Sequence, residues 1–182
     1  FLTEAMNVVN ERKRPYIVME GMSDRFMATY KRPFEAKDIK VVMYAGGLHE
    51  RYGLKKLTEA FMMLPQENFR LKLFGSGPFV EKLKTKYTKK DSRIQYMGVA
   101  PNAEVVAAEL DASLLVNPRP THEEFTKYSF PSKNIEYMAS GTPLLTTKLP
   151  GMPKEYYPYV FLIENESRRL CKGTRKRISS VR

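Results

Sequence analysis

Short, largely apolar runs alternate along this chain with longer segments in which apolar residues recur every three or four positions. The apolar runs lie at 41–44, 71–74, 94–97, 113–116, 144–147 and 160–163. The segments between them, at 54–64, 79–87, 103–110 and 132–140, have the spacing of one helix face. Nearly continuous apolar strands that alternate with helices are typical of a parallel sheet covered on both faces.

The pattern predicts an α/β fold, a doubly wound parallel sheet of Rossmann-like type, over residues 40–166. We interpret residues 1–39 as an entry segment, the tail of an N-terminal domain that the chain lacks. It holds a candidate helix at 3–11, a short apolar strand at 16–19 and a polar linker. Residues 167–182 form a basic tail without an acidic residue, of a kind that is often disordered.

The net charge of +11 raises the question of a nucleic-acid partner, and its distribution argues against one. Seven basic residues and no acid fall in 168–182, which leaves +4 for the rest of the chain. A tail of this kind can bind nucleic acid or an anionic membrane, so a non-catalytic basic module is the alternative function. For residues before the basic tail we expect no nucleic-acid partner.

The length of the apolar runs and the number of cysteines bear on where in the cell the protein is located. No apolar run approaches the ~18 residues of a membrane span, and the single cysteine, Cys171, excludes an internal disulfide. We expect a cytoplasmic protein, with peripheral contact to the inner face of the membrane as an open option. His49 and His122 are the only histidines, and no cluster has metal-ligand spacing, so we expect neither a metal nor a cofactor.

Three loops follow predicted strands and are rich in residues that suit ligand binding. Gly46 and Gly47 follow the first strand, and Gly75 opens a Gly-Ser-Gly-Pro turn after the second. A long polar loop, 117–131, follows the fourth. Ligands of doubly wound sheets bind at such loops, although an isolated glycine pair is more often a tight turn. The full dinucleotide fingerprint is missing, which disfavours a Rossmann-type oxidoreductase.

The segment 130–143, Phe-Pro-Ser-Lys-Asn-Ile-Glu-Tyr-Met-Ala-Ser-Gly-Thr-Pro, carries the most chemistry. It places Ser132 and Lys133 at a helix start and Glu136 one turn later. A helix N-terminus presents backbone N–H groups and a partial positive charge, so an anion docks there readily. We therefore predict a cradle for a nucleotide diphosphate. The simpler alternative is a helix capped by Ser132 with Glu136 on the surface.

Four motifs in order, at 44–53, 73–78, 94–98 and 130–143, resemble the C-terminal half of a GT-B glycosyltransferase. The similar family is the retaining family 4 glycosyltransferases, in the form that serves bacterial capsule and exopolysaccharide assembly. The resemblance implies a nucleotide-sugar donor, with a UDP-sugar favoured, and hexosyl transfer with retention to a glycan or lipid-linked acceptor. The acceptor would bind the missing N-terminal domain, so we expect this chain alone to bind donor without turnover.

The resemblance also implies a set of binding residues. For the nucleotide sugar they are Gly46, Gly47, Gly75, Gly98, Val99, Tyr128, Ser132, Lys133 and Glu136. The Gly46 loop would face the diphosphate, and Gly98 and Val99 would contact the base. Ser132 and Lys133 would bind the phosphates, and Glu136 would bind the ribose.

The chain departs from the family pattern at three of its positions. Tyr128 stands where the family has the first of two glutamates, and Glu123 or Glu124 is a candidate to reach the sugar instead. Gly47 and Tyr52 stand where the family has an arginine and a lysine. We therefore assign the catalytic positive charge to Arg51 and Lys133; without them phosphate binding would be weaker.

Overall fold

The computed structural model describes residues 10, 11, 13–17, 21–23, 27, 37–127 and 130–163. Its strands are β1 (Lys40–Ala45), β2 (Phe69–Phe74), β3 (Ile94–Gly98), β4 (Leu114–Asn117), β5 (Leu144–Thr147) and β6 (Phe161–Ile163). Its helices are α3 (Leu54–Met62), α4 (Phe79–Lys82), α5 (Thr88–Lys90), α6 (Asn102–Asp111) and α7 (Ser132–Ala139). Short helical turns are η1 (Glu50–Tyr52), η2 (Leu83–Tyr87), η3 (Glu124–Lys127) and η4 (Lys154–Tyr159).

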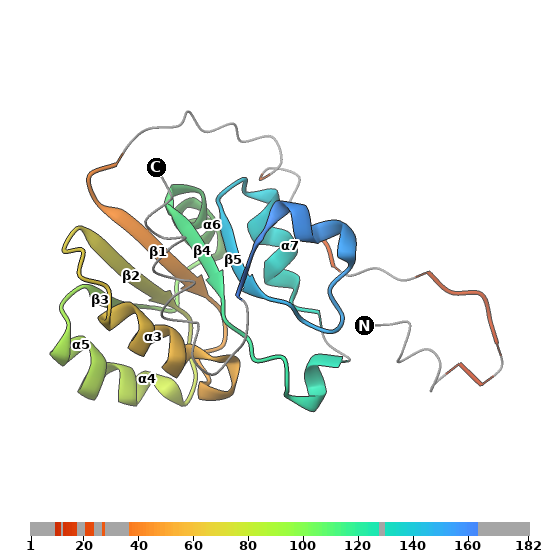
Figure 1. Cartoon of the computed structure of the whole chain (residues 1–182), viewed down its shortest axis with the longest axis horizontal. Coiled ribbons are helices and arrows are strands. Elements are labelled where there is room, and N and C mark those ends of the chain that lie inside the picture. Colours follow the sequence, from red (N-terminus) through yellow and green to blue (C-terminus); the bar gives the residue numbers. More distant parts are fainter. Residues whose placement is uncertain are drawn as a thin grey trace.

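The six strands form one parallel sheet in the order β3-β2-β1-β4-β5-β6 (Figure 1). The predicted α/β, doubly wound fold is thereby confirmed. The strand order reverses between β1 and β4, and such a reversal is where doubly wound sheets bind ligands. The carboxyl ends of β1 and β4 are therefore the first place to look for a site.

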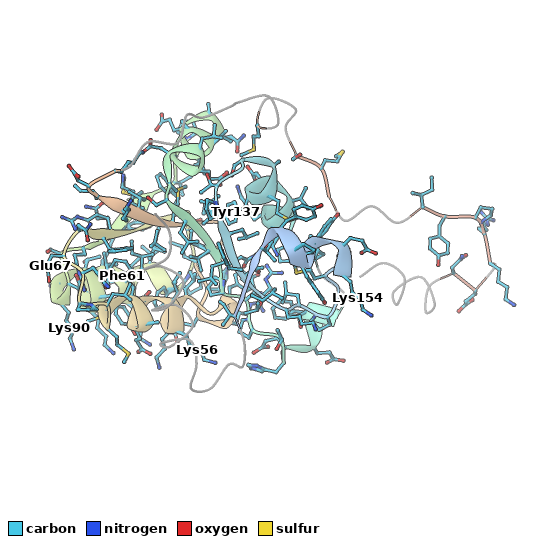
Figure 2. The ribbon with its side chains drawn as sticks, turned by 45° about the horizontal axis from the view of Figure 1, so that its top comes forward. Lys56, Phe61, Glu67, Lys90, Tyr137 and Lys154 are labelled. Carbon is cyan, nitrogen blue, oxygen red and sulfur yellow. The ribbon has the colours of Figure 1, made fainter. Side chains whose placement is uncertain are left out.

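Two apolar layers cover the sheet, one on each face. On one face, Leu57 and Phe61 of α3 pack with Phe79 of α4 against residues of the strands. On the other, Tyr137 of α7 packs with Met43 of β1 and with partly buried residues of α6. Figure 2 labels Phe61 and Tyr137, one from each layer. Because helices protect both faces, the strands are largely apolar, as their sequence pattern indicated.

The predicted element boundaries agree with the structure to within about two residues. The predicted helix at 79–87 is a continuous helical stretch made of α4 and η2. In the entry segment, Tyr16 and Ile17 lie outside any strand, so the start of the strand predicted at 16–19 is wrong. Residues 10 and 11 lie outside any helix, so the end of the helix predicted at 3–11 is wrong as well. The rest of that helix, the rest of the strand and the basic tail lie outside the described residues.

Described residues of the entry segment contact α6 and α7. Met27 is buried with Val106 and Leu110 of α6, and the partly buried Ala139 of α7 packs against them. Lys37 forms an ion pair with the carboxylate of Asp111 and donates a second hydrogen bond to the Asp111 carbonyl at 2.9 Å. A cation at this position is favourable because the C-terminus of a helix carries partial negative charge.

Candidate functional site

The strands β1 and β4 separate at their carboxyl ends. β1 pairs with β2 along its whole length, but with β4 only through Val42 and Met43. Gly46 donates its N–H to the Phe74 carbonyl of β2, so the polar groups of the preceding Ala45 point the other way, toward β4. The Tyr137 hydroxyl meets them there, accepting from the Ala45 N–H at 2.9 Å and donating to the Ala45 carbonyl at 3.2 Å.

Buried amides and a hydroxyl fix the start of α7 over the ends of β4 and β5. Asn117 donates from Nδ2 to Oδ1 of Asn134 at 2.6 Å, and Asn134 donates to the Thr146 hydroxyl at 3.3 Å. Thr146 in turn donates to the Asn117 carbonyl at 3.2 Å. All three residues are buried, so each partner is needed to offset the loss of water. The start of α7 is therefore held at the carboxyl edge of the sheet.

Ser132 and Lys133 begin α7, as predicted, but Ser132 does not cap the helix. Pro131 occupies the N-cap position and no side-chain hydrogen bond caps the helix there. Ser132 is exposed, and the entry segment approaches it: a Cβ atom on Gly21 would lie 3.7 Å from the Ser132 Cα. The simpler interpretation of Ser132 as a cap is therefore wrong.

Lys133 and Glu136, the two charged residues predicted for the site, contact each other. The Lys133 Nζ lies 2.7 Å from Oε2 of Glu136, one turn along α7. It also lies 3.3 Å from Oε1 of Glu109, which α6 contributes. The sequence pattern did not point to Glu109, because the contact between α6 and α7 is tertiary. Lys133 is thus already paired with carboxylates.

Glu109 is a buried acid with one unsatisfied oxygen. Its side chain is 0% exposed, and its Oε2 has no hydrogen-bond partner among the residues that the structure describes. Burial raises the pKa of Glu109 from 4.5 to about 7, and the nearby Lys133 ammonium opposes that rise only in part. Around neutral pH the charge beside Lys133 therefore changes with small changes in pH.

The predicted glycine loops lie against one another at the same edge. The Gly75 N–H donates to the Gly98 carbonyl at 2.7 Å, and a Cβ atom on Gly75 would lie only 1.9 Å from the Gly46 carbonyl oxygen. The Gly47 carbonyl accepts from the Tyr44 hydroxyl at 3.0 Å. Gly75 is therefore required by packing between loops. Val99, predicted to meet the base, follows β3 with 75% of its surface exposed.

Arg51, the other predicted catalytic residue, belongs to a separate cluster with Arg119. The guanidinium carbon of Arg51 lies 5.3 Å from the centre of the Tyr52 ring and 5.8 Å from that of Phe125. The guanidinium carbon of Arg119 lies 4.7 Å and 5.5 Å from the same two centres. His49 adds a further ring, 5.1 Å from Tyr52. Sequence reasoning counted Arg119 only as a polar residue of the long loop.

The remaining predictions for the site have different outcomes. Tyr128 lies outside the described residues, so its predicted role stays a prediction. Glu123 lies 3.6 Å from the imidazole of His122, and Glu124 begins η3 on the exposed side of the loop. Over the residues that the structure describes, no three His, Cys, Asp or Glu side chains gather as a metal site would require. No described helix is both long and apolar enough to cross a membrane.

Comparison with known sequences gives one matching family. The model of the family described as "Glycosyl transferases group 1" matches residues 39–173. Over 112 residues the chain is 30% identical to the "Putative colanic acid biosynthesis glycosyltransferase WcaL" of Escherichia coli strain K12. That match covers 59% of this chain and 27% of the relative. The chain thus spans about a quarter of the length of the curated relatives it matches.

Solved structures share the fold. The C-terminal domain of LpcC, a glycosyl transferase group 1 family protein from Francisella tularensis, aligns with a TM-score of 0.62 at 18% identity. The alignment covers 78% of this chain and 76% of that one. Anabaena Alr3699/HepE in complex with UDP and glucose aligns with a TM-score of 0.62 at 19% identity, over 79% of this chain and 40% of its own. At such identities the likeness establishes the fold, that of the C-terminal half of GT-B proteins.

Proposed function

The chain belongs to the group 1 glycosyl transferases, and from this premise we propose that its sheet domain binds the nucleotide of a sugar-nucleotide donor. We propose a UDP-sugar as the donor and hexosyl transfer with retention as the reaction. The acceptor, a glycan or a lipid-linked glycan, would be bound by another part of a longer protein. Bacterial polysaccharide assembly is the setting that the WcaL relative suggests. A cytoplasmic location beside the inner membrane face belongs to the same proposal.

The observation that carries the proposal is the pairing of Lys133 with Glu136 at the start of α7. Lys133 holds the Glu136 carboxylate in one place, with Oε2 of Glu136 2.7 Å from the ammonium nitrogen. Glu136 retains 19% side-chain exposure, so one carboxylate oxygen can still accept from a ligand. Two neighbouring ribose hydroxyls are suitable donors to a fixed carboxylate. This favours Glu136 as the ribose-binding residue, beside the helix N-terminus.

The expected chemistry is electrostatic. When the bond between the sugar and the diphosphate breaks, negative charge grows on the leaving nucleotide, and cations fixed beforehand stabilise that charge most effectively. Arginine and lysine side chains and backbone N–H groups at the carboxyl edge of the sheet supply such charge. Gly98 ends β3, and Val99 directly after it has 75% of its surface exposed, which favours this segment for contact with a base.

Isothermal titration of this chain with UDP and GDP tests the proposal. We expect UDP to bind in the micromolar to millimolar range and more tightly than GDP. Replacing Glu136 by alanine should weaken UDP binding about ten- to a hundredfold, as expected for a lost charge-assisted hydrogen bond. Glu104→Ala is the matched control, because Glu104 is an exposed glutamate on α6.

Absence of binding for both nucleotides at millimolar concentration would count heavily against the proposal. A truncated chain that ends at residue 167 distinguishes the proposed nucleotide-binding function from the alternative function of a basic module. If UDP binding survives this truncation while salt-dependent binding to nucleic acid or anionic vesicles disappears, the tail is peripheral to donor binding. If UDP binding also requires the tail, the sheet domain is not the whole site.

A further inference from the structure

Arg119 and Arg51 place two guanidinium groups over the same pair of aromatic rings, those of Tyr52 and Phe125. We propose that Arg119, assisted by Arg51, is the residue that binds the diphosphate of the donor. The inference rests on the proposed function, and it changes which residue carries the charge. The rings restrain the guanidinium groups by cation–π contact, which lowers the entropy lost when a ligand binds.

The backbone around Arg119 is fixed at the strand reversal. Arg119 follows β4 by two residues, and the Thr147 hydroxyl donates to its carbonyl. A Cβ atom on Gly53 would lie 2.1 Å from the carbonyl oxygen of Pro118, so the loop after β1 packs directly on the loop after β4. These two loops flank the reversal between β1 and β4, the position at which doubly wound sheets bind ligands.

The electrostatics of the cluster favour an anion. Burial lowers the pKa of the Arg119 guanidinium, and Arg51 acts on it as a like charge. Arg119 is half-buried and lies beside the exposed cation Arg51, so in the free protein it bears two costs, the partial loss of water and the repulsion of a like charge. A diphosphate would relieve both costs at once, because its oxygens accept bidentate hydrogen bonds from planar guanidinium groups.

Lys133 is less suited to the same task. Its ammonium group already lies between the carboxylates of Glu136 and Glu109. Moving it onto a phosphate would leave the buried Glu109 carboxylate without its cation. We therefore assign Lys133 to positioning Glu136. The sequence positions that carry cations in the resembling family hold Gly47 and Tyr52 here, and Tyr52 instead supports both arginines.

Titration of the full chain with UDP and, separately, with uridine isolates the diphosphate contribution. We expect Arg119→Gln to weaken UDP binding about ten- to a hundredfold and to leave the weaker uridine binding unchanged. Arg70→Gln is the matched control for loss of one positive charge. Arg70 lies near the start of β2, at the opposite edge of the sheet, and donates to the carbonyls of Glu67 and Phe69.

The outcomes separate this inference from the proposed function. If the unaltered chain binds no UDP, both fall together. If it binds UDP and Arg119→Gln behaves like Arg70→Gln, the inference is overturned and the proposed function stands. Should Arg119→Gln fail to fold, by circular dichroism, the unaltered protein still decides the question. The Arg119 Nε–Hε resonance should shift on addition of UDP and not of uridine, and equal responses to both would overturn the inference.

Discussion

Tyr137 of α7 holds both backbone polar groups of Ala45, the last residue of β1. Its hydroxyl accepts from the Ala45 N–H at 2.9 Å and donates to the Ala45 carbonyl at 3.2 Å, and its ring is fully buried. Burial raises the pKa of Tyr137 well above its usual value, so the hydroxyl keeps the proton that it donates. One side chain thus substitutes for the strand partner that β4 does not provide. It also fixes the helix that carries Lys133 and Glu136.

Tyr137→Phe should therefore destabilise the domain. The substitution leaves a buried N–H and a buried carbonyl without partners, at about 1–3 kcal/mol for each group. Tyr87→Phe is the matched control: this ring is also buried, but its hydroxyl donates to Glu59 at 3.1 Å, and Glu59 is exposed. Urea unfolding measures both. Equal losses in the two variants would show that the Ala45 bonds do not contribute specifically.

Glu109→Gln should change how stability depends on pH. In the folded protein the pKa of Glu109 is about 7, against an ordinary value of 4.5. Between these values the folded chain holds a proton that the unfolded chain has released, so the free energy of unfolding falls as pH rises. The fall should be of the order of 3 kcal/mol and end near pH 7. Glutamine removes the titration, so the variant should lack this slope.

Urea unfolding at several pH values between 4 and 8 measures that slope in the unaltered chain and in Glu109→Gln. Glu104→Gln, on the exposed side of the same helix, is the control and should keep the slope. At pH 8 we expect Glu109→Gln to be more stable than the unaltered chain. A Glu109→Gln protein with the original pH dependence would mean that another group is responsible for it.

Local sequence predicted the elements of this domain well, and contacts between elements much less well. The start of α7 at Ser132 and the placement of Glu136 one turn later follow from helix periodicity. Glu109 and Arg119 could not be assigned in this way. The role of Glu109 depends on the approach of α6 to α7, and that of Arg119 on two loops whose strands are far apart in sequence.

The glycine loops also show that local sequence does not predict contacts between elements. Sequence reasoning treated Gly46 and Gly75 as residues that let a ligand approach the backbone. In the structure the Gly46 carbonyl itself occupies the space next to the Gly75 Cα. A glycine beside a ligand and a glycine beside another loop have the same sequence signature, and only the tertiary arrangement separates them.

Asn134→Leu should loosen the start of α7. The side chain has a similar volume but cannot accept from Asn117 or donate to Thr146, so buried polar groups on β4 and β5 lose partners. We expect a loss of about 2–4 kcal/mol in the free energy of unfolding. Asn102→Leu, at an exposed position of α6, should cost less than about 1 kcal/mol. Hydrogen exchange at the α7 amides should speed up in the first variant only.

Alanine substitutions at Gly75 and Gly98 should separate backbone strain from steric overlap. Both residues have positive φ, +121° at Gly75 and +77° at Gly98, but no atom in the described part of the chain lies within 4 Å of a Cβ atom on Gly98. Gly98→Ala should therefore lower the free energy of unfolding only through the strain of a left-handed alanine, by about 1–2 kcal/mol. Gly75→Ala adds a clash, because its Cβ atom would lie 1.9 Å from the Gly46 carbonyl oxygen. We expect it to cost more than about 3 kcal/mol in urea unfolding and to displace the loop after β1. Similar costs for the two variants would contradict the close packing of these loops.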